Sequence, residues 1–294
     1  MTAVMYSLVG EQPVPNLLPI RFLAPAATVL VHTDRTKRVS KRLSELLPST
    51  QLLKVDPYDI VQIEECILAD ILASHIDPAA TTFNLTGGTK AMAIAAYRIA
   101  ERMRCRFVYF QTEGRRSLLH AYTWTTDAQP VLEQQDEIPG IISLEDYVRA
   151  HIGEYHVEGR SRAEGGLFEQ QVADLLRSHV DEVALGVKLG GALDADIMIR
   201  KGNRVAVIEA KTGNKAARKE GIDQLNSIAG PDYLGTYTVK FLAIDRQWDK
   251  TRSNLRKLAE ARNITVLELP AGGSMDETGQ DTVQSLVEVV MQKL

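Results

Sequence analysis

Three charged residues in the second half of the chain have the types and the spacing needed to cleave a phosphodiester bond. Asp196 lies in one strand-like run, Glu209 and Lys211 end the next run, and a tight turn at residues 201–203 joins the two. Because residues two apart share one face of a strand, a hairpin brings Asp196 close to Glu209. Two carboxylates bind a hard divalent cation such as Mg²⁺ or Mn²⁺, while the lysine ammonium orients the attacking water or stabilises the transition state.

The setting of these residues favours a functional role over the common alternative, a strand end that carries solvated charges. The run Val205–Ile208 is apolar enough for a buried strand, and charged residues directly after such a run are unusual on an inert surface. Basic residues that could follow a phosphate backbone are dense nearby, although a solvated helix face is the alternative for any one of them. They are Arg200, Lys201, Arg204, Lys215, Arg218, Lys219, Arg246, Lys250, Arg252, Arg256 and Lys257.

Three further polar residues are candidates for the same centre. Glu169 lies early in the helical segment before the two strands, where it could face the site as a third metal ligand. Asp194 shares a strand face with Asp196, so either aspartate could be the ligand, and the spacing to Glu209 favours Asp196. Gln224, on the following helix, could support the centre, but an amphipathic helix carries exposed glutamines by default.

A glycine-containing turn in the first half is a candidate anion-binding loop. Its residues follow a buried-type strand and precede a helix, and they are Thr86, Gly87, Gly88, Thr89 and Lys90. Glycines let backbone amides approach a ligand closely, and the positive end of a helix dipole favours an anion. The loop lacks the Ser or Thr that a Walker A motif places after its lysine, because Ala91 stands there, so nucleotide triphosphate hydrolysis is not expected. Loops with Glu11, Gln12 and Thr33 are expected at the same edge.

Strand-like and helix-like segments alternate through the first half, which predicts an α/β domain with a mostly parallel, Rossmann-like sheet. Such sheets bind ligands at the carboxyl ends of their strands. The expected strands are 4–9, 28–32, 52–55, 81–85, 107–110 and 117–124, and the expected helices are 36–47, 58–74 and 90–104.

Polar loop composition at 126–140 separates this half from a second α/β region. Ser143 and Asp146 predict a capped short helix, and a loose stretch at 153–166 follows. After it we expect helices at 167–178, 216–228 and 251–262 and strands at 182–189, 194–200, 204–210, 237–244 and 264–269.

Both halves resemble known families. Residues 163–270 resemble the restriction-endonuclease-like PD-(D/E)xK nuclease core, on the strand with Asp196 and the strand ending in Glu209-x-Lys211. The first half resembles a CARF domain, on Ser7–Pro13, Val29–Thr33 and above all Asn84–Lys90. We therefore expect a CARF ligand-sensing domain over 1–142, a linker with a short helix over 143–162, and a nuclease domain over 163–294.

The combined resemblance is to the nuclease effectors of type III CRISPR antiviral defence that a cyclic oligoadenylate activates. It implies a homodimer that binds the ring, with cyclic tetra-adenylate favoured, through residues 86–90 with Glu11, Gln12 and Thr33, and that then cleaves DNA, RNA or both. A ring nuclease that degrades its activator in the CARF domain is one alternative. A ligand-sensing regulator that binds nucleic acid without cleaving it is another.

Composition limits the remaining classes. The chain has 294 residues, enough for two domains, with 45% hydrophobic and 24% charged residues, as in globular proteins. We expect no membrane span or secretory signal and, with 2 cysteines, a reducing cytoplasm. A net charge of −4 argues against non-specific coating of nucleic acid but permits a local basic groove.

Overall fold

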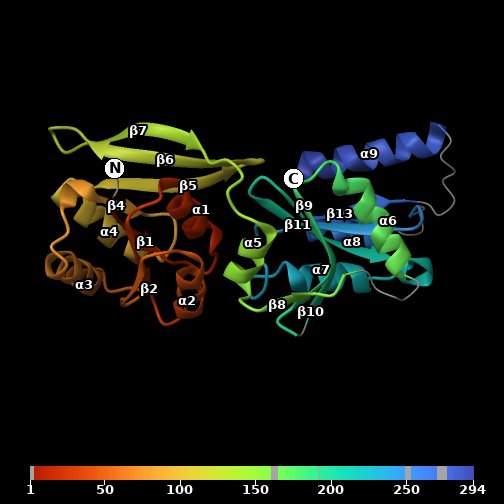
Figure 1. Cartoon of the computed structure of the whole chain (residues 1–294), viewed down its shortest axis with the longest axis horizontal. Coiled ribbons are helices and arrows are strands. Elements are labelled where there is room, and N and C mark those ends of the chain that lie inside the picture. The colour runs from red at the N-terminus through yellow and green to blue at the C-terminus, as the bar shows by residue number, and fades with distance from the viewer. Residues whose placement is uncertain (1–2, 160–164, 192, 249–252, 270–276) are drawn as a thin grey trace. The chain divides into compact units, whose positions relative to one another are not determined.

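The computed structural model describes residues 3–159, 165–191, 193–248, 253–269 and 277–294. The chain divides into two compact units, Met1–Ile141 and Ile142–Leu294, and each contains its own sheet (Figure 1). No helix among the described residues combines the length and the apolar character needed to cross a membrane.

The N-terminal unit is built on a seven-stranded sheet in the order β3-β2-β1-β4-β5-β6-β7. The strands from β3 to β5 are parallel, and β6 and β7 add antiparallel to that edge. The elements are β1 (Val4–Leu8), α1 (Val14–Leu23), β2 (Ala27–His32), α2 (Lys37–Leu46), β3 (Thr50–Lys54), α3 (Ile60–Ala73), the 3-10 helix η1 (Pro78–Ala80), β4 (Thr81–Asn84), α4 (Lys90–Met103), β5 (Arg106–Glu113), β6 (Arg116–Trp124) and β7 (Pro130–Glu137). The mostly parallel α/β sheet expected from the sequence is confirmed.

Apolar side chains on both faces of the central strands hold this unit together. On one face α3 and α4 pack over Tyr6 and Phe83, whose rings stack 5.4 Å apart, and on the other face lie α1 and α2. The strand order reverses between β1 and β4, so the loops after these two strands meet at the sheet's carboxyl edge, which is where open α/β sheets bind ligands.

Two elements of this unit differ from expectation. Helix α1 was not predicted, because Pro13, Pro15 and Pro19 interrupt its sequence; the first two lie at its start, where proline is compatible with a helix. Strand β7 lies in the segment expected to be a loop. Its residues are nearly all exposed, so it shows no apolar alternation, and its backbone pairing with β6 defines it.

The C-terminal unit is built on a six-stranded sheet in the order β13-β12-β11-β10-β9-β8, antiparallel from β8 to β11 and parallel from β11 to β13. The elements are α5 (Leu144–His151), β8 (Tyr155–Val157), α6 (Gly165–Arg177), β9 (Glu182–Leu189), β10 (Leu193–Lys201), β11 (Arg204–Lys211), the 3-10 helix η2 (Gly213–Ala217), α7 (Glu220–Ile228), β12 (Val239–Ile244), α8 (Ser253–Ala261), β13 (Ile264–Glu268) and α9 (Glu277–Lys293). Helices α6 and α9 share one core with the sheet, and α7 covers the opposite face.

The segment expected to be a linker, 143–162, contributes two elements to this unit. Ser143 caps α5 through the expected capping box with Asp146, and β8 pairs with β9 as the edge strand. Residues 160–162 lie outside the described residues. Helix α9 was not predicted, although the spacing of Leu286, Val287, Val290 and Leu294, all buried, indicates one apolar helix face.

Candidate functional site

Strands β10 and β11 separate where the predicted catalytic residues lie. Their ladder runs from Lys201 and Arg204 to Ile197 and Ile208. Beyond it, the backbone N–H of Ala210 donates to Asp196 Oδ2 at 2.8 Å. The aspartate side chain therefore satisfies a backbone donor that the opposite strand has left, and this contact fixes its carboxylate at the fork between the strands.

Glu209 and Lys211 meet Asp196 at this fork. The period of two places Glu209 and Lys211 on the same face of β11. Lys211 Nζ forms an ion pair with Glu209 and lies 3.7 Å from Asp196 Oδ2. The side-chain exposed fractions are 0% for Glu209, 15% for Lys211 and 21% for Asp196, so the three residues predicted from the sequence form one largely buried charge cluster that opens to solvent at the aspartate.

Burial controls the protonation of this cluster. Burial raises the pKa of Glu209 to about 8, and the charge of Asp196 adds to the rise, while Lys211 opposes it. Burial lowers the pKa of Lys211, but the charges of Glu209 and Asp196 outweigh burial, so the net shift is upward. The lysine is therefore a cation at neutral pH, and the glutamate can exchange a proton in the physiological range.

The two carboxylates suit a hard divalent cation. Glu209 Oε2 is a buried oxygen that accepts no hydrogen bond from the described residues, and an oxygen in that state is costly unless a cation or a proton occupies it. Asp196 supplies the second carboxylate on the neighbouring strand. These residues therefore fit Mg²⁺ or Mn²⁺, which prefer oxygen ligands.

The role of Glu169 as a third metal ligand stays a prediction. Among the described residues, no group of three or more His, Cys, Asp or Glu side chains is placed to hold a metal ion. The physical reason is the side of the sheet: α6 packs against the face that carries Ile208 and Ala210, whereas Glu209 faces α7. Glu169 is nevertheless buried and close enough for its charge to help raise the pKa of Lys211.

The structure separates the two candidate aspartates. Asp194 is half exposed and forms an ion pair with Lys188 of β9, away from Lys211. Asp196 alone of the pair contacts the cluster.

Helix α7 approaches the cluster through a glycine. A Cβ atom on Gly221 would lie 3.3 Å from Lys211 Cγ and 2.8 Å from Leu242 Cδ1, so a larger residue there would push on the lysine. Gln224 follows one turn later and is half-buried, and its side chain makes no hydrogen bond with the described residues. The supporting role predicted for Gln224 stays a prediction.

Asp245 is a residue of this edge that the sequence did not indicate. Its Oδ2 accepts the backbone N–H of Gly213 at 2.7 Å, and its own N–H donates to the carbonyl of Lys211 at 3.3 Å. The carboxylate thus holds the turn directly after the lysine. Because 32 residues separate Asp245 from Gly213, no local pattern could have predicted the contact.

Some of the basic residues expected around the cluster are held in ion pairs, Lys219 and Arg246 among them, and other described ones are not. Arg200 and Arg256 are held in ion pairs with Asp181, Glu182 and Glu268, so they serve the fold. Lys215 and Arg218 follow Lys211 in and after η2, are exposed, and form no ion pair with the described residues. Lys250 and Arg252 lie outside the described residues.

In the N-terminal unit, the loops after β1 and β4 touch through glycines. A Cβ atom on Gly87 would lie 2.0 Å from the carbonyl oxygen of Leu8 and 3.0 Å from the N of Gly10. A Cβ atom on Gly10 would lie 3.2 Å from the N of Gly88. Only glycine permits this close approach, which brings the predicted anion-binding loop against the β1 loop at the switch point of the sheet.

The hydroxyls of Thr86 and Thr89, which are predicted to contact a ligand, form hydrogen bonds that hold the loops. Thr86 Oγ1 donates to Asn84 Oδ1 at 2.7 Å and accepts the N–H of Phe110 at 2.7 Å. Thr89 caps α4, accepting the N–H of Met92, and donates to the carbonyl of Pro57 at 2.6 Å. Thr33 is buried, and its backbone N–H donates to the Thr36 hydroxyl at 3.1 Å.

A buried polar network that the sequence did not indicate underlies these loops. Asn84 Nδ2 donates to Ser7 Oγ at 3.0 Å and to the carbonyl of Pro15 at 2.9 Å, and Ser7 Oγ donates to Asn16 Oδ1 at 2.8 Å. It ties β1, α1 and β4 together directly beneath Gly87. The groups left facing solvent are the backbone at Gly88 and the Lys90 side chain, both exposed.

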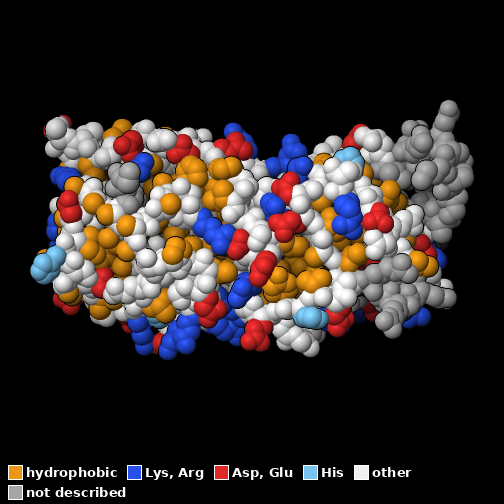
Figure 2. All heavy atoms as spheres, in the orientation of Figure 1, with side chains coloured by type: hydrophobic (Ala, Val, Ile, Leu, Met, Phe, Trp, Pro, Cys, Tyr) orange, Lys and Arg blue, Asp and Glu red, His pale blue; other side chains and the backbone are white. Residues whose placement is uncertain are grey.

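Positive side chains gather at this edge. Figure 2 shows Lys and Arg side chains along the lower margin of the N-terminal unit, where Figure 1 places α2. Helix α2 contributes Lys37, Arg38 and Lys41, all exposed. Glu11 is neutralised by an ion pair with Arg35, so the edge is suited to an anion.

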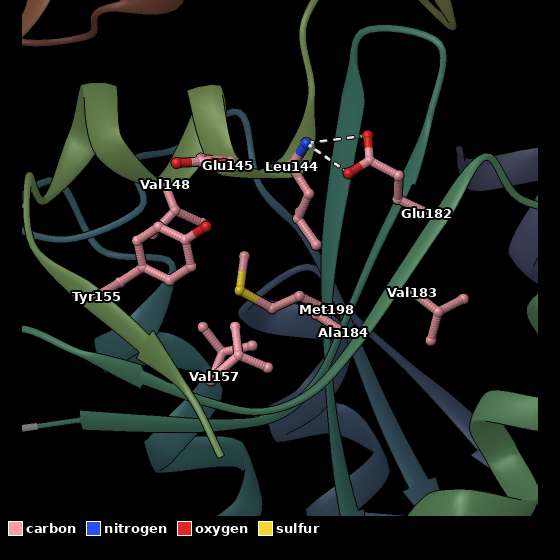
Figure 3. A pocket seen from close by; sticks show the side chains of 10 residues that line it. Leu144, Glu145, Val148, Tyr155, Val157, Glu182, Val183, Ala184 and Met198 are labelled. Atoms are coloured by element: carbon pink, nitrogen blue, oxygen red, sulfur yellow. Dashed lines mark hydrogen bonds between the residues drawn. The ribbon is translucent and has the colours of Figure 1, made fainter. Parts of the chain in front are cut away.

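A groove in the C-terminal unit offers no comparable chemistry. Figure 3 shows it between α5 and strands β8 to β10, with Val148, Val157 and Met198 pointing into it. Its volume is about 370 Å³, and the Glu182 carboxylate at its rim accepts the N–H of Leu144. The groove is therefore mainly an apolar surface.

The sequence matches one known domain family, and the fold is similar to that of several solved structures. Residues 4–147 match the family model described as the Card1 CARF domain. Can2 from Sulfobacillus thermosulfidooxidans, solved in complex with cyclic tetra-adenylate, is 15% identical over 97% of this chain and 98% of its own, with a TM-score of 0.72. Protein VC1899 from Vibrio cholerae is 12% identical over 98% and 97%, with a TM-score of 0.73.

A type III CRISPR defence DNA nuclease activated by cyclic oligoadenylate is 16% identical over 85% of this chain and 46% of its own, with a TM-score of 0.59. No curated protein matches the sequence. Residues 4–147 therefore match the Card1 CARF domain family, and the chain as a whole has the fold of Can2.

Proposed function

We propose that this protein is a metal-dependent nuclease of type III CRISPR defence that a cyclic oligoadenylate activates. The observation that carries the proposal is the convergence of Asp196, Glu209 and Lys211 at the fork between β10 and β11, in a chain whose other unit matches the CARF domain. The C-terminal unit is then a PD-(D/E)xK nuclease domain.

The N-terminal unit is the sensor in this proposal. Support comes from the glycine contact between the β1 and β4 loops, the exposed Gly88 and Lys90 at the start of α4, and the cations of α2. Backbone amides at a helix N-terminus bind phosphate groups, and the cations add attraction for a ring of phosphodiesters. Cyclic tetra-adenylate is the favoured activator, because the Can2 structure holds it. A two-fold homodimer suits a symmetric ring.

Each residue of the cluster has a role in cleavage. Asp196 and Glu209 would hold Mg²⁺ or Mn²⁺, which supplies stabilisation for the charge that builds up on the phosphate. Lys211 carries positive charge at neutral pH, so it can orient the attacking water and stabilise the transition state. Glu209 must lose its proton to hold a cation, so cation binding strengthens as the pH rises toward the glutamate's pKa of about 8.

The substrate is nucleic acid, DNA or RNA. Exposed Lys215 and Arg218 directly beyond Lys211 provide positive charge for a phosphate backbone. Activator binding is proposed to favour the dimeric, cleavage-competent form, as a shift between two populations.

The test incubates the full chain with Mn²⁺ or Mg²⁺, each cyclic oligoadenylate in turn, and labelled single- and double-stranded DNA and RNA. Cleavage should require both the metal and one of the rings. The double variant Glu209→Ala, Lys211→Ala should lose it. Glu145→Ala, Arg149→Ala removes an exposed ion pair on the same unit's surface and should cleave as the wild type does.

Activator turnover is measured in the same reactions. Cleavage that persists in the Glu209 and Lys211 double variant contradicts the proposed centre. Ring degradation that persists in that variant, without any nucleic acid cleavage by the wild type, supports the ring-nuclease alternative instead.

A further inference from the structure

A second polar cavity lies at the other end of strand β11 from the proposed nuclease centre. It has a volume of about 520 Å³ and is lined at the amino ends of β11, β12 and β13. Arg204 begins β11 and Lys211 ends it, and the seven residue steps between them, at about 3.3 Å each, separate the two ends by roughly 23 Å. The cavity is therefore distinct from the Asp196 cluster.

Cations dominate the charged lining. Arg204 of β11, Lys240 of β12 and Lys293 of α9 line the cavity, against one acidic residue among the described lining residues, Glu260. Lys240 and Lys293 form no ion pair with the described residues. Three different elements thus bring positive side chains to one hollow, and two of these side chains, Lys240 and Lys293, have no carboxylate partner among the described residues.

Gathering these cations has an energetic cost. Lys240 is only partly exposed, and burial, with the nearby charge of Arg262, lowers its pKa. Arg262 is itself held by Asp223, which leaves no carboxylate from that pair for Lys240. Like charges in a partly desolvated hollow repel one another, and a bound anion would remove that repulsion.

The neutral lining specifies the kind of anion. Thr236, Asn263 and Thr265 supply hydroxyl and amide groups, and Tyr237, with a relative exposure of 40%, adds an aromatic ring at the wall. Hydroxyls, amides and cations together bind phosphate oxygens, and an aromatic face stacks on a base. A volume in the range of small-molecule sites, roughly 300–1,000 Å³, has room for one nucleotide.

We propose that this cavity binds a phosphate-bearing nucleotide unit, with Lys240 and Lys293 as the principal phosphate contacts. The unit is either a free nucleotide or one residue of a nucleic acid strand, since both present the same phosphate and base. The site is independent of the nuclease centre and remains testable if the proposed cleavage fails.

The test measures binding of three probes to the full chain: inorganic phosphate, AMP and a short fluorescent single-stranded DNA. Two variants are compared with the parent. The first is a double variant that carries both Lys240→Gln and Lys293→Gln. The second carries Lys293→Gln alone, which changes only the exposed end of α9. Lys257→Gln, an exposed lysine of α8 outside the cavity, is the matched control. All proteins, the parent included, also carry Lys90→Gln, so that probe binding at the predicted anion-binding loop of the N-terminal unit is weakened equally in all of them.

The double variant should bind AMP at least about tenfold more weakly than the parent. The Lys293→Gln variant should bind AMP severalfold more weakly, and the Lys257→Gln control should bind it as the parent does. DNA binding that exceeds AMP binding and falls in the same variants identifies a nucleic acid strand as the source, and equal binding identifies a free nucleotide. Variants that bind all three probes as the parent does, or a parent that binds none at millimolar concentration, overturn the proposal.

Discussion

Replacement of Glu209 by glutamine tests whether the candidate centre is maintained at the expense of stability. The glutamate side chain is fully buried, and its pKa of about 8 lies well above the ordinary value of 4.5. A carboxyl group whose pKa is higher in the folded chain stabilises the fold fully below the unfolded pKa, and that contribution is lost as the pH rises through the folded pKa. The relevant window therefore runs from 4.5 to about 8.

The magnitude follows from that window. A shift of one pKa unit corresponds to about 1.4 kcal/mol, so one such group makes the free energy of unfolding fall by about 3 kcal/mol between about pH 5.5 and about pH 8. Glutamine fills the same space but does not ionise. Between these two pH values the free energy of unfolding of Glu209→Gln should therefore fall by about 3 kcal/mol less than that of its parent.

The chain's two tryptophans allow the C-terminal unit to be followed by itself. A Trp124→Phe background leaves Trp248, which is 5% exposed in that unit, as the fluorescent reporter. Urea unfolding in EDTA at both pH values gives the free energies, and Glu288→Gln, on the exposed side of α9, should behave as the parent. The reasoning is refuted if Glu209→Gln and the parent lose the same free energy to within about 0.5 kcal/mol.

Gly87→Ala would place a Cβ atom 2.0 Å from a backbone carbonyl of β1, so it should lower the urea stability of the N-terminal unit by about 2 kcal/mol or more and weaken activator binding. Gly114→Ala, in open space at φ +57°, should cost about 1 kcal/mol, and equal losses for the two would contradict the steric argument. Gly221→Ala, by crowding Lys211, should reduce initial cleavage rates by about tenfold with unchanged activator affinity; an unchanged rate would show that the lysine has room to adjust. Thr89→Ala removes the cap of α4 and should cost about 1 kcal/mol in urea unfolding, a loss that Thr89→Ser should largely restore.

Most helices and strands of both units could be predicted from local sequence patterns. Strands with continuous apolar runs and most helices with apolar residues at helical spacing were predicted to within a few residues, because burial dictates those periods. Helix α9 is the exception, since its apolar spacing was not used to predict it. Strand β7 was not, because its pairing with β6 and not its side chains makes it a strand. The same holds for β8, three residues long at the edge of its sheet.

The candidate centre likewise has features that sequence patterns predict and features that depend on packing between distant segments. The period of two along strands and the turn between β10 and β11 were enough to predict that Asp196, Glu209 and Lys211 meet. Sequence spacing could not show that α6 packs against the face of the sheet opposite to Glu209. Among the described residues Glu169 forms no group of three metal ligands with Asp196 and Glu209, so its role as a ligand stays a prediction.

In the N-terminal unit, local sequence patterns were enough to predict a glycine-containing loop between a buried strand and a helix. The hydrogen bonds between Thr86 and Phe110 and between Thr89 and Pro57 could be found only once the folded chain had brought these segments together. The reason is physical: a side chain's period is set by its own backbone, whereas its partner is set by segments that packing brings from tens of residues away.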